Sequence, residues 1–197
     1  MRLALCLALV LGLASCGAEE ETAEPGRIDD SDQAPPAEPD GPLNSLPDQG
    51  AEPLESNASV DRVVDGDTIV VDVQGRSERV RLIGIDTPES VAQNRPVQCY
   101  GVESSEYLTA LLPPGTPVTL IRDVEARDRY DRLLAYVVRS DDGLFINLDL
   151  VANGYAGLLT FPPNDYYAEL FEEAVSDAAN DGIGLWTACG GPDVPIG

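Results

Sequence analysis

The sequence predicts an α+β, β-rich fold, namely a five-stranded barrel of the OB type braced by about three helices. Five short runs rich in β-branched residues are bounded by turn-forming residues, which is typical of strands. About three runs with helical spacing of apolar residues are interleaved with them, and no segment repeats. Closure into a barrel removes the exposed edges of a small sheet, and the OB-type barrel is a common five-stranded solution.

The first three strands are predicted within residues 59–86. In residues 59–75, β-branched residues are interrupted by Asp-Gly-Asp and then by Gln-Gly, which indicates two strands and two tight turns. A third strand is predicted at 78–86, where Arg81, Ile83 and Ile85 would share one face. An arginine aligned with apolar residues must be paired or must point into a cavity.

Two more strands and three helices follow. The strands are predicted at 116–124 and 132–140. The helices are predicted at 100–112, where a Pro-Pro pair ends the first, at 146–155, where Asn-Gly ends the second, and at 166–184.

The N-terminal part predicts export. Residues 1–15 contain one arginine and an apolar run too short to span a bilayer, as in a signal peptide. The sequence LASC is similar to a bacterial lipobox, so Cys16 is predicted to carry a lipid that anchors a cell-envelope lipoprotein or a form later released outside the cell. A plain secretory signal and an uncleaved segment are the alternatives. Residues 16–59 are acidic and proline-rich and are predicted to be a disordered linker.

The remaining residues divide into a domain at 60–189 and a short C-terminal tail at 190–197. Cys99 and Cys189 are the two cysteines left after the signal and the lipidation site. In an exported protein such a pair favours a disulfide. Two free buried thiols are the alternative.

The composition excludes several kinds of chemistry. The chain has no histidine, all twelve of its basic residues are arginine, and its formal net charge is −23. Histidine-based triads, histidine-rich zinc sites and lysine-dependent phosphate loops are therefore excluded. The charge argues against binding nucleic acid through bulk positive potential. An enzyme of this composition needs a carboxylate base, with arginines or a metal ion as its cations.

Three acids stand near the predicted corner of the third strand. Asp67 lies in the first turn, Asp86 ends the strand, and Glu89 follows Thr87-Pro88, a pair that favours a sharp corner. Hard oxygen ligands of this kind suit calcium or magnesium. Solvated turn residues, or a structural pair between an arginine and a carboxylate, are the alternatives.

A second arginine cluster precedes the fifth strand. Arginines alternate with Asp128 and Asp131, a pattern typical of a solvated loop of neutralising pairs. Arg132 differs because it stands where the strand begins, and its planar guanidinium suits bidentate binding of phosphate.

Four motifs in this order resemble the thermonuclease, or staphylococcal nuclease-like, family, in a bacterial lipoprotein form. They are DGDT at 65–68, RLIGIDTPE at 81–89, DRYDRLLAY at 128–136 and NGYA at 153–156. The resemblance covers about residues 60–189. It implies an OB-fold barrel with three helices and calcium-dependent hydrolysis of phosphodiester bonds in DNA and RNA.

The resemblance also implies roles for single residues. The carboxylates of Asp67 and Asp86 and the carbonyl of Thr87 would bind one calcium ion, and Glu89 would activate the attacking water. The substrate phosphate would be held by two arginines and contacted by a tyrosine; these are Arg81, Arg132 and Tyr130.

The sequence departs from the family pattern in two places. The position before Arg132, often glycine in the family, is Asp131, an acid that could pair with Arg132, and Leu133 follows. Thr160 and Pro162 stand where some members have a base-stacking tyrosine, and Phe161 or Tyr155 are the candidates to replace it. Because lysine is absent, we expect weak, calcium-dependent binding with low sequence preference.

Three functions compete. The leading hypothesis is a monomeric, membrane-anchored, calcium-dependent nuclease acting on DNA and RNA. The second is a catalytically weak or silent OB-fold lipoprotein that binds nucleic acid, against which the intact set of acids and arginines argues. The third is a structural or partner-binding envelope lipoprotein, supported only by the acidity and the linker.

Overall fold

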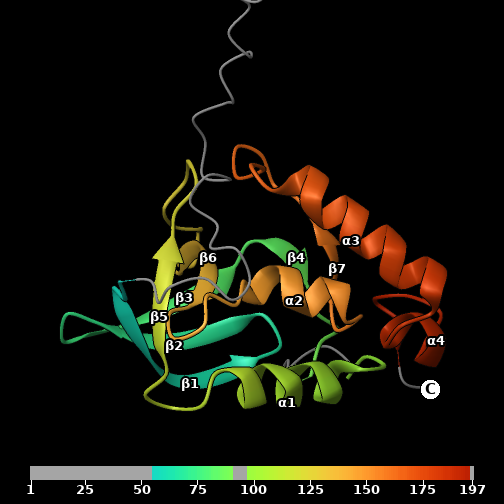
Figure 1. Cartoon of the computed structure of the whole chain (residues 1–197), viewed down its shortest axis with the longest axis horizontal. Coiled ribbons are helices and arrows are strands. Elements are labelled where there is room, and N and C mark those ends of the chain that lie inside the picture. Colours follow the sequence, from blue (N-terminus) through green and yellow to red (C-terminus); the bar gives the residue numbers. More distant parts are fainter. Residues whose placement is uncertain (1–54, 91–96, 196–197) are drawn as a thin grey trace, which may run out of the picture. The chain divides into compact units, whose positions relative to one another are not determined.

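The fold was analysed in a computed structural model that describes residues 55–90 and 97–195 (Figure 1). The predicted signal peptide at 1–15, the predicted lipidation site at Cys16 and most of the predicted linker at 16–59 lie outside the described residues. None of the helices in the described ranges is long and apolar enough to cross a membrane.

Five strands form a closed barrel, as predicted. Their order around the barrel is β1-β2-β3-β6-β5, with β5 pairing back onto β1. All neighbours are antiparallel except β3 and β6, which run parallel. The strands are β1 Ala58–Asp65, β2 Thr68–Val73, β3 Arg76–Leu82, β5 Pro117–Ile121 and β6 Leu133–Arg139.

The turn between β2 and β3 explains why these two strands form a hairpin. Gln74 and Gly75 both have positive φ angles, 55° and 83°. A two-residue loop with that geometry has the twist that antiparallel strands need, and glycine adopts it without steric cost. The predicted Gln-Gly turn is confirmed.

The predicted third strand is two strands. β3 ends at Leu82, and β4, Gly84–Asp86, pairs instead with β7, Gly157–Leu159, in a separate two-stranded sheet. Gly84 has φ +81°, and a Cβ there would lie 2.4 Å from the Phe171 ring. The prediction that Arg81, Ile83 and Ile85 share one strand face is therefore wrong, because the chain bends between them.

Four helices surround the barrel within the described residues, one more than predicted. The fourth is a single short turn. The helices are α1 Gly101–Leu111, α2 Ile146–Ala152, α3 Ala168–Asp181 and α4 Leu185–Ala188. In Figure 1, α1 runs beside β1, and α2 lies between the barrel and α3. α3 ends at Gly182, whose left-handed conformation (φ 65°) stops the helix.

An aromatic cluster joins α3 to the barrel. Tyr136 of β6 meets the Tyr167 ring edge to face, with centroids 4.6 Å apart, and Phe145 and Phe171 complete the cluster. All four rings are at most 2% exposed. Because Phe171 also packs beneath Gly84, this cluster fixes the bend between β3 and β4.

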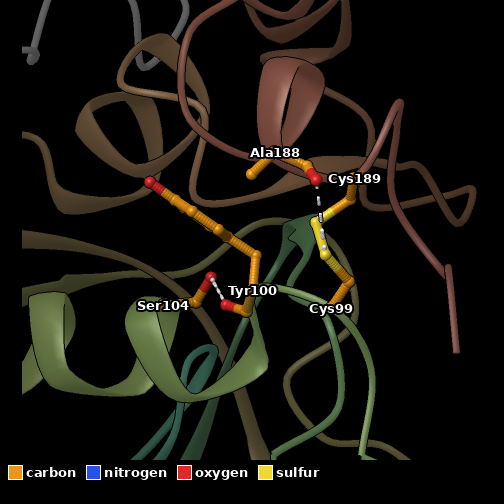
Figure 2. Close-up of a disulfide and its surroundings, with 5 residues drawn as sticks. All are labelled: Cys99, Tyr100, Ser104, Ala188 and Cys189. Atoms are coloured by element: carbon orange, nitrogen blue, oxygen red, sulfur yellow. Dashed lines mark hydrogen bonds between the residues drawn. A yellow bond between two sulfur atoms is a disulfide. The ribbon is translucent and has the colours of Figure 1, made fainter. Parts of the chain in front are cut away.

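A disulfide joins Cys99 to Cys189, as predicted, with Cα atoms 5.9 Å apart. Figure 2 shows that it connects the segment before α1 to the end of α4. The chain beyond Cys189 is also paired, because the Cys99 N–H donates to the Val194 carbonyl at 2.7 Å and Gln98 bridges to Pro195. Strand β1 thus begins at Ala58, two residues before the predicted start of the domain, and main-chain pairing reaches Pro195 in the predicted tail.

Candidate active site

Arg81 lies where β3, β4 and the first turn meet. Its Nη2 is 2.7 Å from Asp86 Oδ1 and 3.2 Å from Asp67 Oδ2. Its Nη1 donates to the carbonyls of Leu82, at 2.6 Å, and Ile85, at 3.0 Å. The side chain is only 12% exposed. The guanidinium is therefore fixed by four oxygens, two of which belong to predicted metal ligands.

Asp67 ties the first turn to the corner at Thr87. Its Oδ2 accepts hydrogen bonds from both the N–H and the hydroxyl of Thr87, each at 3.2 Å, and its Oδ1 accepts one from Thr68 at 3.0 Å. Gly66 permits this approach, since a Cβ there would lie 2.6 Å from the Thr87 hydroxyl oxygen. Three predicted metal ligands, Asp67, Asp86 and Thr87, are thus brought together.

The site holds more negative charge than its arginine neutralises. Burial raises the pKa of Asp86 to about 6 even though Arg81 opposes the shift, and Asp67, Asp193 and Glu89 raise it further. Burial and the neighbouring Asp67 likewise raise the pKa of Asp65 to about 6. Burial and nearby carboxylates both oppose the ionisation of these two acids. A divalent cation would offset this, so the site suits such a cation.

The donor set fits a hard cation held by few protein ligands. No group of three or more His, Cys, Asp or Glu side chains in residues 55–90 and 97–195 is arranged to hold a metal. Two carboxylates, those of Asp67 and Asp86, converge instead on a single Arg81 nitrogen. Calcium takes six to eight oxygen ligands and magnesium often keeps one or two carboxylates. Main-chain carbonyl, water and phosphate oxygens would complete such a shell.

Glu89 lies beside this cluster and is held through its main chain. Its N–H donates to Gln98 Oε1 at 2.6 Å, and its charge acts on Asp86. Within the described ranges, no hydrogen bond or ion pair engages its carboxylate. A carboxylate without a partner there is available to a water molecule.

Arg132 has an acidic partner that was not predicted. Asp128 Oδ2 accepts from Arg132 Nε and lies 2.7 Å from Arg132 Nη2 as well. Burial alone would raise the pKa of Asp128, but hydrogen bonds from Arg132 and from the Tyr130 N–H outweigh it and lower the pKa. The i,i+4 spacing of acid and arginine was the signal for this pair.

The predicted pairing of Asp131 with Arg132 is not observed. Asp131 adopts a left-handed conformation (φ 65°), and its side chain is 88% exposed. Its nearest cation is Arg127, at 3.6 Å, which also makes two 3.0 Å hydrogen bonds to Glu78. The turn directs the acid away from Arg132, and Asp128 takes its place.

A cavity of about 530 Å³ lies between the two predicted phosphate arginines. Arg81 and Arg132 both line it, together with Tyr130 and Phe161, whose side chains are 65% and 69% exposed. Tyr155, the other candidate for base stacking, instead stacks on Tyr107 with centroids 3.8 Å apart. Arg81 thus contacts Asp67 and Asp86 and also lines the cavity.

The parallel pairing of β3 with β6 explains how distant arginines reach one cavity. Val80 is opposite Leu133 and Arg81 is opposite Leu134. Arg132 immediately precedes this register, so it stands beside the same end of β3 as Arg81. Of the predicted site, the structure brings Asp67 and Asp86 together around Arg81 and places Arg132 and Tyr130 in the lining of the same cavity.

Comparison with known proteins identifies similar sequences. A profile of the family described as "Staphylococcal nuclease homologue" matches residues 79–188, which include Arg81, Glu89 and Arg132 but begin after Asp67. The thermonuclease of Staphylococcus intermedius is 44% identical over 127 residues, covering 64% of this chain and 74% of that protein. The thermonuclease of Staphylococcus hyicus is 39% identical over 133 residues, covering 68% and 77%. Endonuclease YncB of Bacillus subtilis (strain 168) is 28% identical over 193 residues, covering 94% and 90%.

Proposed function

Because this chain belongs to the staphylococcal nuclease family and is a hydrolase of phosphodiester bonds, we propose that it cleaves DNA and RNA with one calcium ion and with water activated by Glu89. One observation carries the proposal. Arg81 contacts both Asp67 and Asp86 and also lines the cavity that Arg132 lines. A phosphate in that cavity would meet two arginines and lie next to the acids.

The acids have a defined part in this proposal. Asp67, Asp86 and the Thr87 carbonyl would hold the calcium ion, which when bound offsets the repulsion between the acids and the phosphate and polarises a phosphate oxygen. The hydrogen bonds from Thr87 and Thr68 to Asp67 keep that carboxylate in place. Residues around a site orient its ligands in this way in many metalloproteins.

The two arginines stabilise the charge that develops on the phosphate. Arg81 is oriented by four oxygens, and its Nη2 would become available to a phosphate oxygen where Asp67 and Asp86 turn to a cation instead. Arg132 is held by Asp128 through Nε and Nη2 and can exchange part of this pairing for a phosphate oxygen.

Glu89 is the proposed general base. No other side chain among the described residues competes for its carboxylate, and histidine is absent from the whole sequence. A positioned carboxylate within hydrogen-bond reach of water can take its proton during in-line attack on phosphorus. The leaving oxygen then departs opposite the attacking water.

Apart from Arg81 and Arg132, two aromatic side chains that line the cavity are available to the nucleotide. Tyr130 is proposed to contact a substrate phosphate through its hydroxyl, and Phe161 offers an exposed ring on which a base can stack. The net charge of −23 opposes association with a polyanion. We therefore expect weak binding, with a high KM and little discrimination between sequences.

We further propose that the protein works outside the cytoplasm. The signal-like residues 1–15 and the lipobox-like sequence before Cys16 support an exported, lipid-anchored monomer. The disulfide between Cys99 and Cys189 is consistent with an oxidising compartment.

Digestion of plasmid DNA and of single-stranded RNA tests the enzymatic proposal. Wild-type protein should cleave both with calcium and neither with a chelator. Glu89→Gln and Arg132→Ala should each lower kcat at least about 100-fold, the size expected when a base or a transition-state cation is removed. Arg62→Ala is the matched control, because Arg62 is an exposed arginine of β1, which carries no proposed site residue.

The same experiment addresses the alternative of a silent binding module. That alternative predicts retention of labelled nucleic acid without cleavage, with or without calcium. Full cleavage by Glu89→Gln would refute the assignment of the base, and cleavage in chelator would refute the metal requirement.

A further inference from the structure

Gln98 makes hydrogen bonds to both main-chain polar groups of Glu89, its N–H and its carbonyl. Its side-chain Oε1 accepts the Glu89 N–H at 2.6 Å, and its own N–H donates to the Glu89 carbonyl at 2.8 Å. One residue therefore satisfies both main-chain polar groups of the proposed base. Buried or half-buried main-chain groups need such partners, and two bonds to one residue restrict rotation as well as position.

Gln98 is itself anchored from the opposite end of the chain. Its Nε2 donates to Asp193 Oδ1 at 3.1 Å. The next residue is Cys99, which is bonded to Cys189, and its N–H donates to the Val194 carbonyl at 2.7 Å. Figure 2 shows the covalent link that brings the end of α4 to this segment. The support of Glu89 thus includes residues about a hundred positions later.

The first residue of α1, Gly101, contacts both Gln98 and Glu89. The Gly101 N–H donates to the Gln98 carbonyl at 3.1 Å. A Cβ on Gly101 would lie 2.5 Å from the Glu89 carbonyl oxygen and 3.1 Å from that of Pro88. Only glycine allows the helix to approach this closely, so Glu89 lies between the helix start and the Gln98 side chain.

From these contacts we propose that Gln98 is a positioning residue for the general base, acting through the hydrogen bond that its Oε1 accepts from the Glu89 N–H. The inference rests on the proposed role of Glu89. No described side chain holds the Glu89 carboxylate, so the position of this carboxylate depends on the position of the Glu89 main chain. Gln98 fixes that main chain through its two hydrogen bonds. A misplacement of about 1 Å in a reacting group can lower a rate about 100-fold.

Two variants of equal length isolate the hydrogen bond. Gln98→Met keeps the size of the side chain but has no acceptor oxygen for the Glu89 N–H, whereas Gln98→Glu keeps that oxygen; Gln98→Glu is made together with Asp193→Asn, so that the new carboxylate does not face the Asp193 carboxylate. We expect kcat of Gln98→Met to fall at least about 10-fold, with KM and calcium dependence nearly unchanged, and kcat of Gln98→Glu to stay within about 3-fold of wild type. Asn57→Ala is the matched control, since Asn57 is an amide that makes two hydrogen bonds to the main chain of Leu120 on β5.

A double-mutant cycle separates positioning from a general loss of structure. In a Glu89→Gln background, Gln98→Met should lower the residual rate less than about 2-fold, because its effect passes through the missing base. The inference is overturned if Gln98→Met matches wild type, if Gln98→Glu is as slow as Gln98→Met, or if the full loss persists in the Glu89→Gln background. Failure of wild-type cleavage, or normal cleavage by Glu89→Gln, refutes the proposed function instead, and this inference with it.

Discussion

Removal of the Cys99–Cys189 disulfide should cost a large part of the stability of the domain. The bond joins residues 90 apart. The chain-entropy relation for a loop of that length gives about 4.6 kcal/mol, and measured losses for native disulfides are typically about 2–5 kcal/mol. Small domains are stable by only about 5–15 kcal/mol. We therefore expect the double variant Cys99→Ser/Cys189→Ser to lose between a third and most of its stability.

Urea denaturation followed by circular dichroism measures this loss. The midpoint of unfolding should fall for the double variant, and reduction of wild-type protein should reproduce the fall. The reductant should leave the double variant unchanged, which controls for effects unrelated to this bond. A loss below about 1 kcal/mol would contradict the reasoning, because it would mean that the unfolded chain gains little freedom when the bond is absent.

Three further predictions follow from single positions. Gly84→Ala should destabilise the protein by about 3 kcal/mol in urea denaturation, because the residue has φ +81° and the new Cβ would collide with buried Phe171. Stability equal to wild type would refute the bend described at this position. Asp131→Asn should lower KM for nucleic acid about 2-fold at low salt and leave kcat unchanged, because it removes an exposed acid between two residues that line the cavity. Asp61→Asn on β1 is the control and should leave KM unchanged. Equal effects of the two changes would show that only net charge matters. The folded-state pKa of Asp86 is raised to about 6 from 3.8, so its contribution to stability is fully present below about pH 4 and is lost as the pH rises through about 6. Calcium should therefore raise Tm more at about pH 8 than at about pH 5, and this difference should shrink in Asp86→Asn; an increase independent of pH would contradict the assignment.

Local signals predicted most of the barrel because its strands are bounded by turn residues. The Gln-Gly turn between β2 and β3 and the helix stop before Gly154 are examples of chemistry contained in a few adjacent residues. The division of the third strand could not be predicted in this way. The run from Arg81 to Asp86 is interrupted only by Gly84, and the bend at this glycine depends on Phe171, which lies 87 positions later.

The site residues that stand in short motifs could also be predicted, whereas their contacts with other residues could not. Asp67, Arg81, Asp86 and Arg132 were predicted because they stand in recognisable motifs. The partner of Arg132 was not, since both Asp128 and Asp131 stand within reach in sequence, and only the left-handed turn at Asp131 decides between them. The support of Glu89 by Gln98 was also missed, because it depends on a C-terminal segment that was predicted to be a tail.

The parallel register of β3 and β6 couples catalytic competence to correct folding. A slip of one residue between these strands would turn Val80 and Leu82 away from the core and would move Arg81 to the opposite face of the sheet. The same error would separate Arg81 from Arg132, so a chain paired in the wrong register would lose its apolar core and its proposed phosphate site together. Cleavage of nucleic acid is therefore a direct assay of strand registration in refolding experiments, and inactive but compact species would be the ones to test for a slipped barrel.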